Sequence, residues 1–218
     1  MKKIGIFGGT FDPVHNGHIT VAGEFAEAFD LDRVFMMASA NPPHRSATSA
    51  TAGQRYEMLC LAVQQDPRLV SSDMEIRRRG LSYTLDTVEE ISARHGSAIP
   101  WLALGADAFA EISTWYRPAD VLARVHLVVL TRPGFDVDLT GPLPDKARHR
   151  YTPGKEGVFI HDAGGTLRAL EVTPVDLSSS RIREMAARGE EIANLVPGPV
   201  FQYIQLNGIY RPETTAPG

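Results

Sequence analysis

The chain has 218 residues, 43% of them hydrophobic and 22% charged, and a formal net charge of −4. These values are near the averages of globular proteins, which argues against a disordered chain and against a membrane protein. The acidic balance argues against a domain that binds nucleic acid through bulk positive charge, so any anion site must be local. The apolar run after residues 1–3 is too short for a signal peptide, and Cys60 is the only cysteine, which favours the reducing cytoplasm.

Strand and helix patterns alternate along the first part of the chain. Five apolar runs predict buried strands at residues 3–7, 33–39, 68–72, 100–105 and within 123–134. Helical spacing predicts helices over residues 18–29, 52–65 and 82–96. The third helix has Ser82 as its expected N-cap and Gly96 just after its end. This alternation predicts an α/β fold, a Rossmann-like doubly wound parallel sheet with helices on both faces.

The rest of the chain has a weaker pattern. Residues 134–157 are rich in proline, glycine and charged residues and predict a surface excursion, not a domain boundary. Short edge strands are expected within 157–165 and 167–177, and helices over 178–190 and 197–208. We therefore expect one domain over residues 1–210 with a small C-terminal helical part, followed by a flexible tail at 211–218.

Turns or loops follow four of the predicted strands, at Gly8 and Gly9, at Asn41, at Gly105 and at residues 132–134. The carboxyl ends of parallel strands lie on one edge of a sheet, so these segments are expected to line one crevice. Gly8 and Gly9 stand between a strand and a helix, where amide N–H groups and the helix dipole favour a phosphate. They fit neither the phosphate loop of nucleoside triphosphatases nor the dinucleotide fingerprint of dehydrogenases, and a plain tight turn is the alternative.

Two histidines follow the glycine pair. His15 and His18 are three residues apart at the start of a helix, so their rings can point to one side. Gly17 between them removes a side chain where a ribose or a flat ring could press against the backbone. A zinc site would need two more ligands, and Cys60 belongs to another helix. Packing or helix capping is a second alternative, and a phosphate contact is favoured because histidine can donate a hydrogen bond to a phosphate oxygen.

Residues 178–183, SSSRIR, form a second candidate anion site. Serines at a helix start expose N–H and hydroxyl donors, and Arg183 can reach back with its forked guanidinium. An ordinary serine N-cap with a solvated arginine is the alternative. Two helix starts that face one crevice would suit a ligand with several phosphates.

Further polar and aromatic side chains follow the fourth predicted strand. Trp115 and Tyr116 could stack on a heterocycle or could be a core aromatic pair. The Asp107 carboxylate could accept hydrogen bonds from ribose hydroxyls or could cap the next turn.

These motifs resemble those of a known family. GGTFDPVHNGH (residues 8–18) resembles the G-x-F-D-x-x-H-x-G-H signature of the nucleotidyltransferase superfamily, and LSSSRIR (177–183) is similar to its I-S-S-T-x-x-R motif. The stretches NPPHR, SYTLDT, GADAF, TWYRP and LTRPG resemble the bacterial nicotinate-nucleotide adenylyltransferases, and the similarity runs from about residue 3 to residue 207. Leu177 and Ser180 stand where the family often has Ile and Thr, and residues 136–157 match no family pattern.

The resemblance implies transfer of the adenylyl group from ATP to nicotinate mononucleotide, giving deamido-NAD and pyrophosphate in NAD biosynthesis. It implies Mg²⁺ as a cofactor that accompanies ATP, with no metal ligands assigned in the protein. ATP and nicotinate mononucleotide would be the partners, without nucleic acid or membrane, and a homo-oligomer is left open. The same chemistry on nicotinamide mononucleotide or phosphopantetheine, and a non-catalytic nucleotide-binding module, are the alternatives.

The resemblance also implies roles for individual residues. His15, His18 and Arg183 would be catalytic. The ATP-binding residues would be Gly8, Gly9, Thr10, Phe11, His15, Gly17, His18, Gly105, Asp107, Ser179, Ser180 and Arg183. The acceptor would contact Asn41, His44, Arg45, Thr84, Asp107, Trp115 and Tyr116.

Overall fold

The apolar runs assemble into one eight-stranded sheet in the order β3-β2-β1-β4-β5-β8-β7-β6. The computed structural model describes residues 2–39, 48–78, 80–96 and 99–211. The strands are β1 (Ile4–Gly9), β2 (Arg33–Ala38), β3 (Leu69–Ser72), β4 (Trp101–Gly105), β5 (His126–Thr131), β6 (Tyr151–Pro153), β7 (Phe159–His161) and β8 (Thr166–Glu171). The α-helices are α1 (Asn16–Ala28), α2 (Ala52–Ala62), α3 (Met74–Arg77), α4 (Thr84–His95), α5 (Ala106–Ala110), α6 (Pro118–Leu122), α7 (Asp145–Arg148), α8 (Ser179–Ala187) and α9 (Gly198–Leu206). Two short 3₁₀ segments are η1 (Val63–Gln65) and η2 (Ile112–Thr114).

Six of these strands pair in parallel, and β6 and β7 extend the sheet in antiparallel pairing. The Rossmann-like fold with its parallel sheet is therefore confirmed, and the antiparallel strands are confined to this edge. The connections at residues 154–158 and 162–165 are too short for the crossover that a parallel pair requires, so the chain turns back on itself. Residues 134–157 thus contribute α7 and β6 to this edge and are not purely a surface loop.

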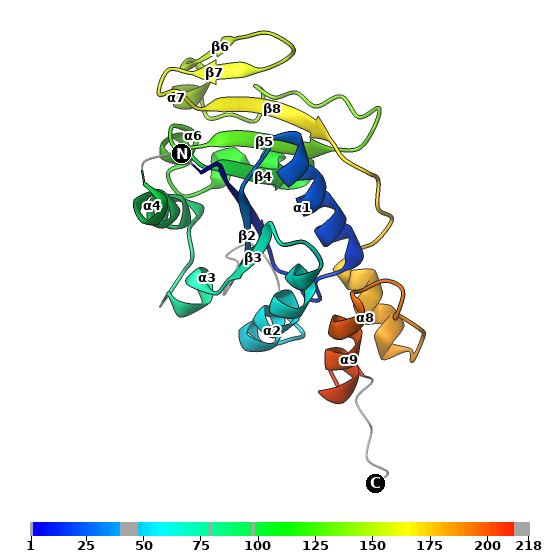
Figure 1. The fold of residues 1–218 in the computed structure, drawn as a ribbon. Coiled ribbons are helices and arrows are strands. Elements are labelled where there is room, and N and C mark those ends of the chain that lie inside the picture. Colours follow the sequence, from blue (N-terminus) through cyan, green and yellow to red (C-terminus); the bar gives the residue numbers. More distant parts are fainter. Residues whose placement is uncertain (1, 40–47, 79, 97–98, 212–218) are drawn as a thin grey trace.

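Side chains that alternate along the strands fill two cores, one on each face of the sheet. Phe7 of β1 belongs to the core beneath α1, α2, α8 and α9, whereas Ile4 and Ile6 belong to the core beneath α4, α5 and α6. Figure 1 shows α1 and α4 on opposite sides of β1 and β2. Both faces of the parallel strands are covered, as the continuous apolar runs predicted. Among the described residues, no helix is long and apolar enough to cross a membrane.

The helix boundaries differ from the predicted ones where side chains take other partners. The extended backbone of His15 makes it the N-cap of α1, so this helix starts at Asn16 and not at His18. Ser82 is not the N-cap of α4, because its hydroxyl donates to the Glu75 carbonyl at 3.2 Å and Tyr83 takes the cap position. Gly96 does end α4, with a φ of 74° that favours glycine.

Candidate active site

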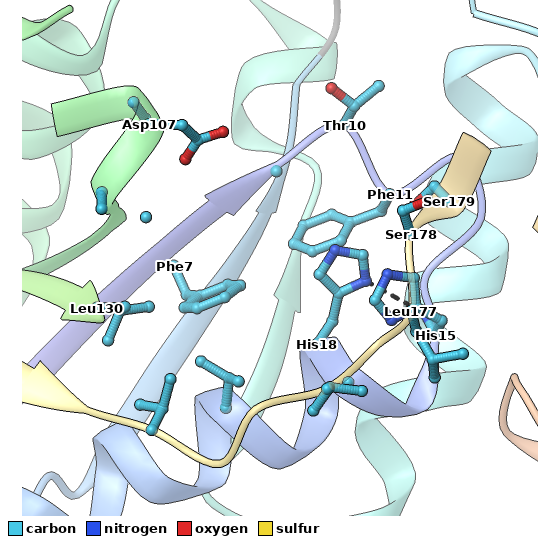
Figure 2. Close-up of a pocket in the computed structure, with 18 of the residues that line it drawn as sticks. Phe7, Thr10, Phe11, His15, His18, Asp107, Leu130, Leu177, Ser178 and Ser179 are labelled. Carbon is cyan, nitrogen blue, oxygen red and sulfur yellow. Dashed lines mark hydrogen bonds between the residues drawn. The ribbon is translucent and has the colours of Figure 1, made fainter. Parts of the chain in front are cut away.

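A cavity of about 1050 Å³ opens at the carboxyl ends of β1, β4 and β5 (Figure 2). The convergence of the turns at Gly8, Gly105 and Arg132 is confirmed, because all three line this cavity. Asn41, His44 and Arg45 lie outside the described residues, and Thr48 is the lining residue nearest to them in the chain. Every predicted ATP-binding residue lines the cavity: Gly8, Gly9, Thr10, Phe11, His15, Gly17, His18, Gly105, Asp107, Ser179, Ser180 and Arg183.

The two histidine rings stack on each other beside the glycine turn. Their centroids are 3.7 Å apart with an interplanar angle of 23°, and the edge of the Phe11 ring meets His18 at 5.0 Å. Figure 2 shows both rings next to Phe11 and the serines of the α8 start. The i, i+3 spacing therefore places both histidines on one side of α1, as predicted.

The backbone fixes which nitrogen of His18 carries the proton. The backbone N–H of His15 donates to Nδ1 of His18 at 3.2 Å, so this nitrogen is an acceptor. A neutral ring whose Nδ1 accepts carries its proton on Nε2. His18 is thereby oriented as an Nε2–H donor by the same turn that starts α1.

His15 is held in a more enclosed position. Only 6% of the residue is exposed, and its Nδ1 has no hydrogen-bond partner within the described part of the chain. Burial lowers the pKa of His15 to about 4, because the charged ring would lose its hydration. The ring is therefore neutral at pH 7 in the free protein.

This burial predicts a pH dependence of folding stability. The unfolded chain binds a proton at His15 near pH 6.5 and the folded chain only near pH 4, so the stabilisation is present above pH 6.5 and lost as the pH falls towards 4. The pKa difference corresponds to about 3 kcal/mol in the free energy of unfolding. Urea unfolding at pH 7 and pH 4.5 should show a larger acid loss for the wild type than for His15→Gln. An equal loss in the two proteins would contradict the assignment, and the comparison cancels the contribution of the other buried histidine, His161.

The glycines of the turn have different surroundings. A Cβ at Gly9 would lie 2.8 Å from the Phe11 ring, whereas a Cβ at Gly8 would meet nothing within 4 Å. A Cβ at Gly17 would lie 2.8 Å from Val175 Cγ1 and 3.1 Å from His15 Nδ1. Val175 thus occupies the direction in which a Cβ of Gly17 would point, and this packing accounts for the glycine, while Gly17 itself still lines the cavity.

Alanine at Gly8 and at Gly9 should separate folding from ligand binding. Gly9→Ala is expected to lower the free energy of unfolding by about 1–3 kcal/mol, because the methyl group overpacks against Phe11. Gly8→Ala should leave stability nearly unchanged and weaken ATP binding, because its methyl group enters the cavity. Denaturant unfolding and titration calorimetry with ATP would measure both effects. Equal stability of the two variants would contradict this difference.

The start of α8 is hydrogen-bonded to the segment between β1 and α1, residues 10–15, which we call the histidine turn. Ser178 is its N-cap and accepts from the backbone N–H of Arg181 at 3.2 Å. The Ser179 hydroxyl donates to the Pro13 carbonyl at 2.9 Å, and Arg183 Nη1 donates to the Asp12 carbonyl at 2.7 Å. These two bonds join segments more than 160 positions apart and place the two helix starts at one cavity.

Arg183 also reaches the exposed serine of this helix start. Its Nη2 donates to the Ser180 hydroxyl at 3.2 Å, and its side chain is 30% exposed. The guanidinium therefore both holds α8 to the turn and faces the cavity, so the interpretation as a merely solvated arginine is wrong.

Asp107 lies across the cavity from the histidines, in the first turn of α5 (Figure 2). Its side chain is exposed, and its carboxylate would collide with a Cβ at Gly105, at 2.7 Å. Glycine at position 105 therefore lets this carboxylate lie close to the strand end.

The cavity is not lined by three of the predicted acceptor residues, Thr84, Trp115 and Tyr116. Thr84 is the first residue of α4, and Trp115 is half-buried against the core beneath that helix. Tyr116 is 49% exposed and its ring lies 4.3 Å from the ring of Tyr83. Tyr83, which the sequence pattern did not single out, thus joins this group.

The described residues form no cluster of metal-ligating side chains. Among the described residues, no group of three or more His, Cys, Asp or Glu side chains could hold a metal ion. Within these residues, His15 and His18 have no further ligands of the kind that a zinc site needs.

Comparisons with known proteins agree with this geometry. A family model described as cytidylyltransferase-like matches residues 6–185. A Pseudomonas syringae pv. tomato protein named "Probable nicotinate-nucleotide adenylyltransferase" is 37% identical over 215 residues, which cover 98% of this chain and 96% of that protein. A Clostridium tetani protein of the same name is 33% identical over 97% of this chain and 100% of its own length. The chain belongs to the nicotinate-nucleotide adenylyltransferase family.

A solved structure supports the fold described above for this chain. The Plasmodium falciparum nicotinic acid mononucleotide adenylyltransferase complexed with NaAD has a TM-score of 0.71 and 15% sequence identity, over 96% of this chain and 98% of that one. At this identity the likeness concerns the fold alone. It confirms the Rossmann-like architecture predicted from the alternating pattern.

Three interacting residues at or near the cavity were not singled out from the sequence, and Asp12 is the one of them that lines it. Asp12 and Arg55 are buried, and Tyr210 at the far end of the chain contacts Asp12. The F-D pair of the first motif contained Asp12, but no local pattern connects it with Arg55 or Tyr210.

Proposed function

We propose that the chain transfers the adenylyl group of ATP to nicotinate mononucleotide, producing deamido-NAD and pyrophosphate in NAD biosynthesis. The observation that carries this proposal is the joint cavity of α1 and α8, where two helix starts, two histidines and an arginine face one space. Such an arrangement offers donors and positive potential to a polyphosphate. The names of the relatives supply the acceptor.

The reaction on this surface is a direct displacement at the α-phosphorus. An oxygen of the nicotinate nucleotide's phosphate forms the new bond to the α-phosphorus. The bond from this phosphorus to the α,β-bridging oxygen breaks, and the electron pair leaves with pyrophosphate. The protein's contribution is to align the two phosphates and to stabilise the developing negative charge.

His18 and His15 supply donors for this charge. The orientation of His18 as an Nε2–H donor suits contact with an α-phosphate oxygen. His15 is neutral when no ligand is bound, and an approaching anion raises its pKa because it favours the charged ring. Arg183 and Ser180 would hold the β- and γ-phosphates from the other helix start.

The serines of the second motif support a reaction without a covalent intermediate. The Ser178 side chain caps α8, and the Ser179 hydroxyl donates to Pro13. Both hydroxyls are engaged in structural hydrogen bonds, one within α8 and one to the turn, so the cavity presents donors in preference to an activated nucleophile.

A divalent cation, which we take to be Mg²⁺, would enter with ATP. Mg²⁺ is usually held by substrate phosphates, water and one or two carboxylates, which is compatible with the single exposed carboxylate of Asp107 in the cavity. Bound in this way it neutralises charge on the triphosphate.

The acceptor would bind on the side of α4 and the segment after η2. Trp115 would stack on the pyridine ring, and Thr84 with the backbone near Tyr116 would receive the nicotinate carboxylate. The exposure of Tyr116 and its contact with Tyr83 support a contact surface there. Roles of Asn41, His44 and Arg45, a homo-oligomer and a cytoplasmic location stay predictions.

The purified chain, incubated with ATP, Mg²⁺ and nicotinate mononucleotide, should release pyrophosphate and form deamido-NAD in equal amounts. Chromatography with mass detection would identify the dinucleotide. Tight ATP binding without pyrophosphate release with any acceptor would instead indicate a nucleotide-binding module.

A further inference from the structure

A buried polar network lies behind the histidine turn, and Asp12 is its centre. Asp12 is 3% exposed, and its carboxylate accepts from the backbone N–H groups of Ser49 at 2.8 Å and Ala50 at 3.1 Å. The hydroxyl of Tyr210 donates to the same carboxylate at 2.6 Å. A buried carboxylate needs such donors, because without them its desolvation is not compensated.

Two arginines hold the carbonyl groups of the turn. Arg55, which is 0% exposed, donates from Nη1 to the Thr10 carbonyl at 2.6 Å, and Arg183 donates to the Asp12 carbonyl at 2.7 Å. The Thr10–Phe11 peptide is trans, so its N–H points opposite to its carbonyl. The N–H of Phe11 therefore points away from Arg55. Arg55 does not line the cavity, whereas Thr10 and Phe11 do. The network thus determines how the turn presents its peptide groups.

Tyr210 brings the end of the chain into this network. It follows α9 and stands 198 positions after Asp12, and its neighbour Ile209 is buried in the core beneath α1. Its φ of 63° is left-handed, which is costly for a residue other than glycine and persists only when the surroundings hold it. Burial and the contact with Asp12 raise the pKa of the hydroxyl, so it stays a donor.

We propose that Tyr210 is a positioning residue for adenylyl transfer, acting through Asp12 to hold the histidine turn in its reactive geometry. This inference rests on the proposed function but concerns residues that do not touch the reacting atoms. Removing the hydroxyl leaves a buried carboxylate with fewer donors, so the turn gains freedom at the place where charge develops.

The test compares Tyr210→Phe with Tyr203→Phe, a matched change on α9. The Tyr203 hydroxyl makes no hydrogen bond within the described part of the chain. Well below the melting temperature, Tyr210→Phe should lower kcat by about tenfold with less than about a twofold change in KM for ATP, and Tyr203→Phe should match the wild type. In a double-mutant cycle, adding Tyr210→Phe to Asp12→Asn should lower kcat by a smaller factor than adding it to the wild type.

Hydrogen exchange of the Ser49 and Ala50 amides gives a readout that needs no acceptor. These amides should exchange faster in Tyr210→Phe than in Tyr203→Phe. Unchanged kcat in an active enzyme, or full additivity with Asp12→Asn, would overturn the catalytic role. If the wild type made no dinucleotide, the proposed function would fall and the role in catalysis with it, while unchanged exchange would show that Tyr210 does not hold the turn at all.

Discussion

His18→Ala is expected to lower kcat by on the order of a hundredfold or more, the loss typical of one donor that acts on the transition state. The ring is oriented by the backbone N–H of His15 and stacks on the His15 ring, so its donor is already in place before the ligand arrives. Steady-state rates of pyrophosphate release at saturating ATP would measure the loss. Titration calorimetry with ATP would show whether ground-state binding changes less than kcat.

His149→Ala is the matched control for this change. His149 is exposed at the end of α7 and does not line the cavity, so its variant should turn over at the wild-type rate. A His18→Ala enzyme with normal kcat would show that the ring only packs against Phe11 and His15.

Arg183→Ala is expected to lower kcat/KM for ATP by about 10²–10³-fold, because the variant loses a charged donor to the leaving phosphates. It also loses the bond to the Asp12 carbonyl, which holds α8 against the histidine turn. Arg183→Lys keeps the charge but not the forked geometry, so it should recover only part of the loss. Initial rates over a range of ATP concentrations would measure both variants.

The control lies on the same helix. Arg181 is exposed and pairs with Asp176 at 3.4 Å, away from the turn, so Arg181→Ala should retain nearly full activity because exposed ion pairs contribute little. Equal losses in the Arg181 and Arg183 variants would contradict the specific role of Arg183, because they would show that its contacts with Asp12 and Ser180 add nothing beyond a positive charge near the α8 start.

Local sequence patterns predicted the parts of the site that depend on neighbours in the chain. The apolar run of β1, the glycines at its end and the i, i+3 histidines together predicted a strand, a phosphate-binding turn and a helix start with both rings on one side. Residues that follow the carboxyl ends of parallel strands meet at one edge of the sheet. The convergence of Gly8, Gly105 and Arg132 followed from that rule alone.

Contacts between distant segments could not be predicted in this way. The hydrogen bond from Tyr210 to Asp12 spans almost the whole chain, and neither residue stands in a periodic pattern that marks the other. The contact of Val175 with Gly17, which leaves no room for a Cβ there, also joins distant segments and has no local signal. Ser82 had the composition of an N-cap, but the nearby Glu75 carbonyl takes its hydroxyl. In each case a tertiary partner decided between local alternatives.

The acceptor preference tests the proposed function most directly. Initial rates of pyrophosphate release with ATP and Mg²⁺ should be measured with nicotinate mononucleotide, nicotinamide mononucleotide and phosphopantetheine as separate acceptors. Formation of the adenylylated product of each acceptor should be checked in parallel. We expect the highest kcat/KM with nicotinate mononucleotide. A higher kcat/KM with either of the other acceptors, or no release with any of the three, would contradict the assignment of nicotinate mononucleotide as the acceptor.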